Sequence, residues 1–292
     1  KAFIASGDRS VRLYDVEGRR DLKRFVGHNG SVWSVAVNAE GTRLLSSSMD
    51  GTVRVWDVET AQERMRFNEH SSLVTAVAFT PNGKWAVTGG FDGLVAVWKI
   101  ANGEEICRAE KLGFVTAIAV DPNGKFALIA ADRHIDMMDL GNGSLIRRYE
   151  GHDASVGCVA LLADGSRFVS GADDGTIHIW ETSLNKPIAS LIGHVGSVRS
   201  VMNSANDRWL ITAGADRTVR LWDLPAKSEV AAFRKHAVPV VAAAFLSNGT
   251  QTLSGDRDVN LLPWKVDKFF TAAPVSPAVT PKAPDAIPLA KP

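Results

Sequence analysis

Short apolar segments recur along the whole chain and are separated by turns rich in Gly, Asp, Asn and Pro. In the unit after His28, residues 31–37 (SVWSVAV) form a nearly continuous apolar run, as expected for a strand buried on both faces. The turn NAEGT follows, then RLLSSS, the turn MDG and TVRVWDV, and finally the more polar QERMRFN, which suits an edge strand. Helical periodicity is absent. The pattern predicts an all-β chain built from four-stranded units.

This unit repeats along the chain. An aromatic or large apolar residue near the end of the third strand marks each copy, at Tyr14, Trp56, Trp98, Met138, Trp180, Trp222 and Trp264. Successive markers are 42 residues apart, except for one spacing of 40. A period of about 40–45 residues with four short strands per unit is typical of β-propeller blades. We therefore predict a seven-bladed β-propeller over residues 1–270.

The two ends of the chain depart from the repeat. The first unit opens at what should be its second strand, so its inner strand is missing, and the last unit lacks a convincing outer strand. We expect an upstream segment of about half a repeat to provide both strands; residues 267–273 (DKFFTAA) are an alternative source of the outer one. Residues 271–292 contain six of the twelve prolines, which predicts an extended linker or disordered tail.

Five units carry a His, a Ser or Thr, an Asp and a Trp at matching offsets. These sets are His28, Ser46, Asp50, Trp56; His70, Thr88, Asp92, Trp98; His152, Ser170, Asp174, Trp180; His194, Thr212, Asp216, Trp222; and His236, Ser254, Asp258, Trp264. With these motifs the sequence resembles the WD-repeat family of β-propellers, and the resemblance extends to about Phe270. The literal Trp-Asp pair occurs only at Trp56-Asp57 and Trp222-Asp223.

The resemblance implies that each set is a structural tetrad, in which hydrogen bonds run from Asp to His to Ser or Thr to Trp. A His buried between blades needs partners for both ring nitrogens, and a carboxylate and a hydroxyl can provide them. The competing interpretation is a Ser–His–Asp nucleophile. Ser and Thr alternate, five copies occur, and no GxSxG motif is present. We therefore expect no catalytic residues and no enzyme activity.

The fourth unit has lost most of the set, with Lys111, Leu128, Asp132 and Met138 at the matching positions. An apolar pair can replace a polar chain at little cost when it is well packed. The unit is then a blade held together by packing. The alternative is a blade freed to bind something, for which the segment ADRHIDMMD is a weak indication.

Composition narrows the classes of partner. Lys and Arg number 33 against 32 Asp and Glu, so no bulk field attracts nucleic acid or an anionic membrane, and no apolar run is long enough to span a bilayer. With at most one His at the tetrad position of each unit, we expect no metal ion and no other cofactor. The isolated Cys107 and Cys158 are expected to be buried free thiols, which favours a reducing, cytoplasmic location. We expect a monomer.

The resemblance also implies docking of partners on the face that carries the His loops and the Asp turns. On this face one arc is apolar and consists of Trp33, Met49, Leu73, Phe91 and Phe114. The opposite arc is basic and consists of Arg199, Arg217 and Arg257. Clustered surface aromatic and Met side chains suit a binding site, although they could instead tuck into neighbouring loops.

These observations predict a non-catalytic protein–protein interaction scaffold that binds a peptide or a protein loop on this face. The alternative is a regulatory or substrate-presenting propeller fused to a catalytic domain outside this chain. An enzyme with its site in the central channel is a weaker alternative, because the inner strands carry almost no acids or histidines.

Overall fold

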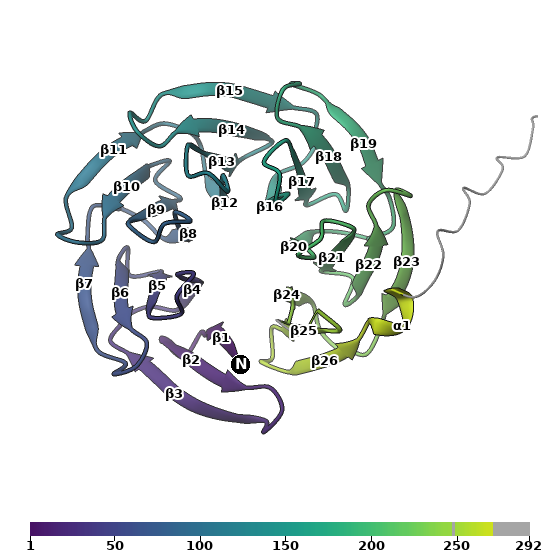
Figure 1. The fold of residues 1–292 in the computed structure, drawn as a ribbon, viewed down its shortest axis with the longest axis horizontal. Coiled ribbons are helices and arrows are strands. Elements are labelled where there is room, and N and C mark those ends of the chain that lie inside the picture. Colours follow the sequence, from purple (N-terminus) through teal and green to yellow (C-terminus); the bar gives the residue numbers. More distant parts are fainter. Residues whose placement is uncertain (247–248, 271–292) are drawn as a thin grey trace, which may run out of the picture.

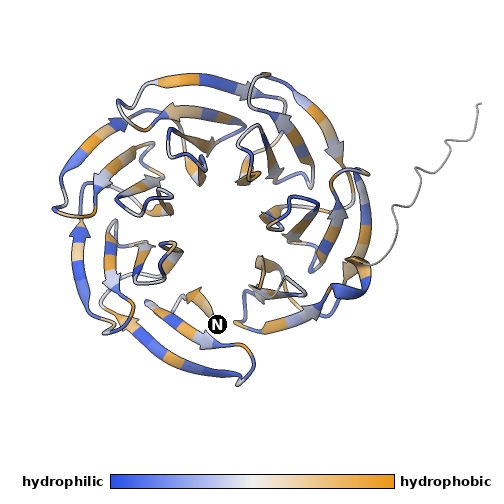
Figure 2. Ribbon diagram, in the orientation of Figure 1, coloured by the Kyte–Doolittle hydropathy of each residue, from blue (hydrophilic) through white to orange (hydrophobic). Residues whose placement is uncertain are grey.

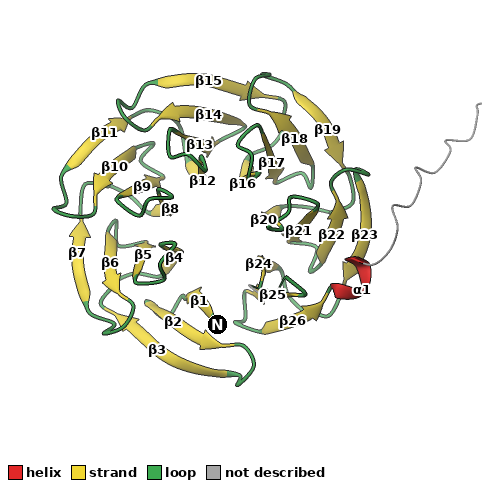
Figure 3. Ribbon diagram, in the orientation of Figure 1, coloured by secondary structure: helices red, strands yellow, loops and turns green. Residues whose placement is uncertain are grey.

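The structure is a computed structural model that describes residues 1–246 and 249–270. In these residues seven antiparallel sheets stand around a central opening, and successive strands of each sheet lie progressively further from it (Figures 1 and 3). The predicted all-β, seven-bladed propeller is confirmed. The Pro-rich segment 271–292, predicted to be a linker, lies outside the described residues.

Five blades have four strands each, ordered from the opening to the rim. The second blade has β4 (Val32–Val37), β5 (Arg43–Ser48), β6 (Val53–Asp57) and β7 (Glu63–Phe67). The third has β8 (Val74–Phe79), β9 (Trp85–Gly90), β10 (Val95–Lys99) and β11 (Glu105–Ala109). The fourth has β12 (Val115–Val120), β13 (Phe126–Ala131), β14 (His134–Asp139) and β15 (Leu145–Glu150).

The fifth and sixth blades follow the same order. The fifth has β16 (Val156–Leu161), β17 (Arg167–Ala172), β18 (Ile177–Glu181) and β19 (Pro187–Leu191). The sixth has β20 (Val198–Asn203), β21 (Trp209–Gly214), β22 (Val219–Asp223) and β23 (Ser228–Phe233). Their two middle strands are almost fully buried, whereas the outer strands carry hydrophilic stretches (Figure 2).

The first and last blades have three strands each. The first has β1 (Ala2–Ala5), β2 (Ser10–Asp15) and β3 (Arg20–Val26), and the seventh has β24 (Val240–Phe245), β25 (Gln251–Asp256) and β26 (Leu261–Lys265). By its place in the repeat, β1 matches the second strand of the complete blades. The first blade therefore lacks an inner strand in this structure, as predicted.

The suggestion that residues 267–273 form the last outer strand is wrong for the described part, 267–270. This segment is a short helix, α1 (Asp267–Phe270), beside the sixth blade (Figure 1). The ring of Phe270 stacks on Trp209 at 5.2 Å, and Phe269 meets Phe233 at 6.2 Å. A helical turn lets both neighbouring phenylalanines reach one apolar surface, whereas a strand would direct them to opposite faces.

The apolar core lies in the seams between blades. One cluster joins Leu45 and Val55 of the second blade to Val74 and Trp98 of the third, and comparable clusters fill the next seams. A sheet with two apolar faces must bury both, so each blade depends on its neighbours. This dependence explains why the repeat builds a ring.

Side chains also tie the inner strands of adjacent blades together. Thr75 Oγ1 donates to the Val115 carbonyl at 2.6 Å, and Thr116 Oγ1 donates to the Val156 carbonyl at 2.6 Å. In the next seam the buried thiol of Cys158 takes the place of the hydroxyl. Both cysteines are free thiols, but Cys107 is only half-buried, in contrast to the expectation that both would be buried.

Thr75→Val should lower the free energy of unfolding by about 1 kcal/mol, because valine keeps the shape but leaves buried carbonyls without their donor. Urea unfolding measures the change. The exposed Thr60 serves as the control, and Thr60→Val should change stability by less than about 0.5 kcal/mol. Equal effects of the two substitutions would show that the contact between inner strands contributes nothing.

Candidate docking face and the polar network beneath it

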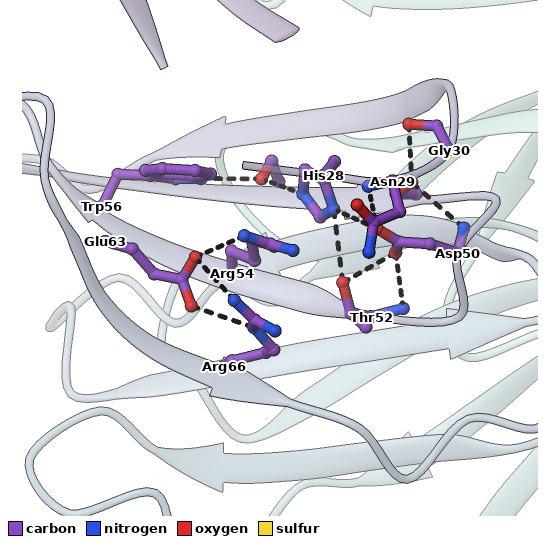
Figure 4. A network of polar contacts seen from close by, with 11 residues as sticks. His28, Asn29, Gly30, Asp50, Thr52, Arg54, Trp56, Glu63 and Arg66 are labelled. Carbon is purple, nitrogen blue, oxygen red and sulfur yellow. Dashed lines mark hydrogen bonds and ion pairs between the residues drawn. The ribbon is translucent and has the colours of Figure 1, made fainter. Parts of the chain in front are cut away.

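In the second blade a chain of hydrogen bonds links four side chains (Figure 4). His28 Nδ1 lies 3.0 Å from Asp50 Oδ2, and His28 Nε2 lies 2.7 Å from Ser46 Oγ. Trp56 Nε1 donates to the same hydroxyl oxygen at 2.7 Å. If Nδ1 carries the proton for the carboxylate, Nε2 accepts the Ser46 proton and every polar group has a partner.

The third and sixth blades repeat this arrangement, with His–carboxylate distances of 3.0 Å and a Thr in place of Ser. The residues brought together are His70, Thr88, Asp92 and Trp98 in the third blade, and His194, Thr212, Asp216 and Trp222 in the sixth.

The fifth blade departs from the expected set at Asp174. His152 Nε2 meets Ser170 Oγ at 2.7 Å, but its Nδ1 meets Thr176 Oγ1 at 3.1 Å. Thr176 in turn donates to Asp174 at 2.6 Å, so the expected direct bond between His152 and Asp174 is replaced by a relay. The carboxylate of Asp174 is exposed, and the ring of His178 stacks on His152 at 4.1 Å.

In the seventh blade the assignment of Asp258 is wrong. His236 Nδ1 lies 2.7 Å from Asp256 Oδ2, while Asp258 is exposed and only its backbone N–H contacts Asp256. Asp256 ends the second strand, where the third and sixth blades have Gly90 and Gly214. A Cβ added at Gly214 would lie 2.6 Å from His194 Nδ1, so this position points at the imidazole. A carboxylate there displaces the turn Asp as its partner.

The fourth blade fills the same space with apolar side chains. Leu128 and Met138 are fully buried, and Leu112 packs in the same apolar cluster as Met138. Lys111 is exposed. Asp132 keeps one role of the turn Asp, because its carboxylate accepts the Phe114 N–H at 3.3 Å. These contacts support the interpretation of a blade held by packing.

A second polar network in the fourth blade escaped the sequence analysis. The carboxylate of Asp136 is buried and accepts two hydrogen bonds from Arg148, at 2.8 and 3.0 Å, and His134 Nε2 lies 3.2 Å away. Burial alone would raise the pKa of Asp136, but His134 and Arg148 hold it below its usual value. The alternation of His134, Ile135 and Asp136 placed two polar side chains on one face of β14 and could have indicated a polar pair. Their third member, Arg148, is on the next strand and could not be seen from this segment.

The tetrad of the sixth blade favours an ionised Asp and a neutral His. Burial alone would raise the pKa of Asp216, but bonds from Thr218, His194 and the Val195 N–H lower it to about 2. Burial lowers the pKa of His194, and Asp216 only partly opposes this. The hydroxyl of Thr212 is fully buried and engaged by both rings, so a substrate has no access to it.

The residues of the apolar arc lie on one rim above these tetrads. Backbone hydrogen bonds join Met49 to Ser31 and Phe91 to Leu73, each at 2.9 Å, so each Asp turn is fastened to its own His loop. The exposed fraction is 52% for Trp33, 55% for Met49, 38% for Phe91 and 60% for Phe114, and Leu73 is half-buried.

Two aromatic rings of this arc touch each other across a seam. Phe91 of the third blade and Phe114 of the fourth have ring centroids 5.3 Å apart, tilted by 46°. Leu73 is joined to Phe91 through the backbone. The structure therefore brings Leu73, Phe91 and Phe114 together, with Trp33 and Met49 on the same rim of the second blade.

The opposite arc is less purely basic than its sequence indicated. Arg199 and Arg257 are exposed, but Arg199 Nη1 lies 3.8 Å from Asp173 Oδ1. Two exposed valines on this side were missed, Val195 (79% exposed) and Val259 (51% exposed). Val195 directly follows the tetrad residue His194, so a comparison of the residues after each tetrad His could have predicted that it is exposed.

No group of three or more His, Cys, Asp and Glu suited to a metal ion occurs within residues 1–246 and 249–270. Across the same ranges, no helix combines the length and apolar character that a membrane span requires.

A known protein family matches this chain. The family model described as "WD domain, G-beta repeat" matches residues 19–57, 61–99, 143–181 and 185–223, which together make up more than half of the chain. The unmatched stretches include the three inner strands of the fourth blade, which lacks the tetrad, the first two strands of the first blade and the whole seventh blade.

Curated relatives match over shorter segments. An intraflagellar transport protein 122 homolog of Danio rerio is 40% identical over 57 residues, covering 20% of this chain and 5% of the relative. Pre-mRNA-processing factor 17 of Saccharomyces cerevisiae is 34% identical over 58 residues, covering 20% and 13%. A serine-threonine kinase receptor-associated protein of Gallus gallus is 35% identical over 48 residues, covering 16% and 14%. Each match spans only a small part of the relative.

Asp256→Ala should lower the free energy of unfolding by about 1–3 kcal/mol, because it leaves the buried His236 without its carboxylate. Asp258→Ala should change it by less than about 0.5 kcal/mol. Chemical denaturation of both variants measures the difference. The reverse order of effects would show that Asp258 is the partner of His236.

Acid should destabilise the fifth blade. Burial, and then the nearby His178, lower the pKa of His152 to about 4. In the unfolded chain the pKa of a His is about 6.5, so the unfolded state binds the proton more tightly. This contribution to stability is complete above pH 6.5 and is lost as the pH falls toward 4. Urea unfolding should show a loss of about 2 kcal/mol from this group between pH 7 and pH 5.

His178→Asn is the companion variant for this pH series. It removes the neighbouring imidazole, so the pKa of His152 should rise toward its usual value and the loss between pH 7 and pH 5 should shrink. Each protein is compared only with itself at the two pH values. An unchanged pH dependence in His178→Asn would contradict the role given to the stacked pair.

Proposed function

The chain belongs to the WD-repeat family, and we propose that it is a non-catalytic interaction scaffold that docks a peptide or protein loop on its apolar rim. Propellers of this family typically serve as platforms for protein partners. The observation that carries the proposal is the exposed contact between Phe91 and Phe114, with Leu73 beside it and Trp33 and Met49 on the adjoining blade.

The exposed aromatic and Met side chains gathered on one rim belong to residue types that are enriched at protein interfaces. Their backbones are fixed by the hydrogen bonds between each Asp turn and His loop, which in the third blade hold Phe91 to Leu73. A partner would therefore meet side chains that are already positioned and would lose little additional entropy on binding.

The basic side of the rim adds a polar element. Arg257 and Arg199 are exposed, and Arg199 is only loosely paired with Asp173 at 3.8 Å. We propose that an acidic portion of the partner lies along this side, where charges at the edge of an interface chiefly affect the association rate. The partner is a protein or peptide, and neither nucleic acid nor a membrane is part of the proposal.

Trp33→Glu combined with Phe91→Glu should weaken partner binding by about thirty-fold or more while leaving the thermal midpoint of unfolding nearly unchanged. A photoreactive phenylalanine analogue at position 114 would first identify the partner by crosslinking and mass spectrometry. Calorimetry with the purified partner then measures affinity.

The matched control is Leu145→Glu combined with Ile146→Glu, which places the same two charges on exposed apolar positions of the outer strand β15. This control should bind like the unchanged protein. Undiminished affinity in the Trp33 and Phe91 variant, or equal losses in both variants, would refute docking on the apolar rim.

A further inference from the structure

A groove of about 450 Å³ lies at the seam between the second and third blades, at the ends of the strands opposite the docking face. It is lined by residues 38–40 and 43 of the second blade, by residues 81–85 of the third blade, and by residues 99–101 at the end of β10. These segments carry no tetrad residue and none of the apolar arc. The groove is therefore separate from the proposed docking face.

The seam between the fifth and sixth blades shows how the same place is filled elsewhere in the ring. There the carboxylate of Asp207 reaches across the seam and accepts the backbone N–H of Ala163 at 2.7 Å. A second carboxylate, Asp223, lies 3.4 Å from Arg208. In this seam, acids of the same chain therefore accept the Ala163 N–H and pair with the guanidinium of Arg208.

The two seams correspond residue by residue. The turn TPNGKW (80–85) of the third blade matches SANDRW (204–209) of the sixth, so Gly83 stands where Asp207 does and Lys99 stands where Asp223 does. The backbone conformation is the same, with φ of +65° at Gly83 and +55° at Asp207. Asp207 and Asp223 are therefore both missing from the groove, whereas Glu40 keeps the place of Asp164.

The donor that Asp207 satisfies is left open in the groove. Ala39 occupies the position of Ala163, and its N–H has no partner among the residues that the structure describes. In the third and fourth blades the matching residues are Pro81 and Pro122, which have no N–H to offer. The groove thus has both the donor and the space for a carboxylate.

The charges of the groove also favour an anion. Arg43, Lys84 and Lys99 line it against the single acid Glu40. Within the described chain, Arg43 and Lys84 have no ion-pair partner, whereas Lys99 pairs with Glu104 at 2.9 Å. In the fifth–sixth seam, acids outnumber bases among the matching residues. The groove has the opposite balance.

We propose that this groove binds the carboxylate of an acidic peptide segment, which takes the place that Asp207 fills in the other seam. The Ala39 N–H donates to the carboxylate, and Arg43 and Lys84 neutralise it. The half-buried indole of Trp85, in the groove wall, packs against an apolar side chain next to the acid. The bound segment is a second contact, distinct from the apolar rim.

The decisive variant fills the groove from within. Gly83→Asp should supply the carboxylate in cis, because Asp207 already adopts this conformation and a Cβ at Gly83 would come no nearer than 3.7 Å to Asn38. The probe is a fluorescein-labelled, amidated hexapeptide with acidic residues around one phenylalanine, followed by fluorescence anisotropy. Affinity should fall by about tenfold or more. The thermal midpoint should fall no further than in Gly249→Asp, where φ is also positive, at +66°.

Charge reversal provides an independent variant with a matched control. Arg43→Glu with Lys84→Glu should also weaken the probe by about tenfold or more. Lys125→Glu with Arg167→Glu introduces the same two charges at the residues that match Lys84 and Arg43 in the fourth and fifth blades. These two residues belong to different seams, so this variant should bind the probe normally. Gly249→Asp, at the equivalent and open turn position of the seventh blade, controls for the added acid.

Three outcomes would overturn the proposal. The first is undiminished binding in Gly83→Asp. The second is equal binding of a probe in which Gln and Asn replace the acids. The third is competition by inorganic phosphate as effective as that by the acidic peptide, which would make the groove a general anion site. None of these outcomes depends on the apolar rim, so the docking proposal is tested separately.

Discussion

Every blade of this ring depends on its neighbours, because a sheet with two apolar faces has to bury both. The large Trp side chains, such as Trp98 and Trp222, lie in clusters that combine residues of two blades. A single repeat could not hold these residues out of water. The seam is therefore the true unit of stability, and the positions of polar groups follow from what a seam can tolerate.

A buried imidazole is tolerated only if both of its nitrogens are satisfied. The blades meet this requirement in different ways: Asp50 contacts His28 directly, Thr176 relays to Asp174 in the fifth blade, and Asp256 replaces the turn acid in the seventh. The fourth blade avoids the requirement by having no His there. In every blade that has the buried His, both ring nitrogens have a hydrogen-bond partner, but the residue that supplies the partner differs between blades.

This distinction explains what the sequence could and could not predict. The period and the turn residues were enough for the seven blades and their strands, because alternation and glycine turns are local properties. The repeat spacing predicted the wrong partner for His236, Asp258, because the direction of the Asp256 side chain at the end of β25 decides which carboxylate reaches the imidazole. The repeat also suggested an outer strand where the structure has α1, because two adjacent phenylalanines favour a helical turn there. The exposure of most of the apolar rim could be predicted, because residues at the same offset from the tetrad occupy the same place in each blade.

Departures from the repeat are the most informative positions in such a chain. Residues that recur in every blade serve the common fold, so a side chain that only one blade has marks a local difference. Asp207 is such a residue, because the second, third, fourth, fifth and seventh blades have glycine at its place. Gly83 has no side chain with which to make the bond that Asp207 makes across its seam. Neither turn alone reveals this, because the groove forms between turns about forty residues apart. The chemistry of such a groove is therefore set by two turns of different blades, and no single sequence motif contains it.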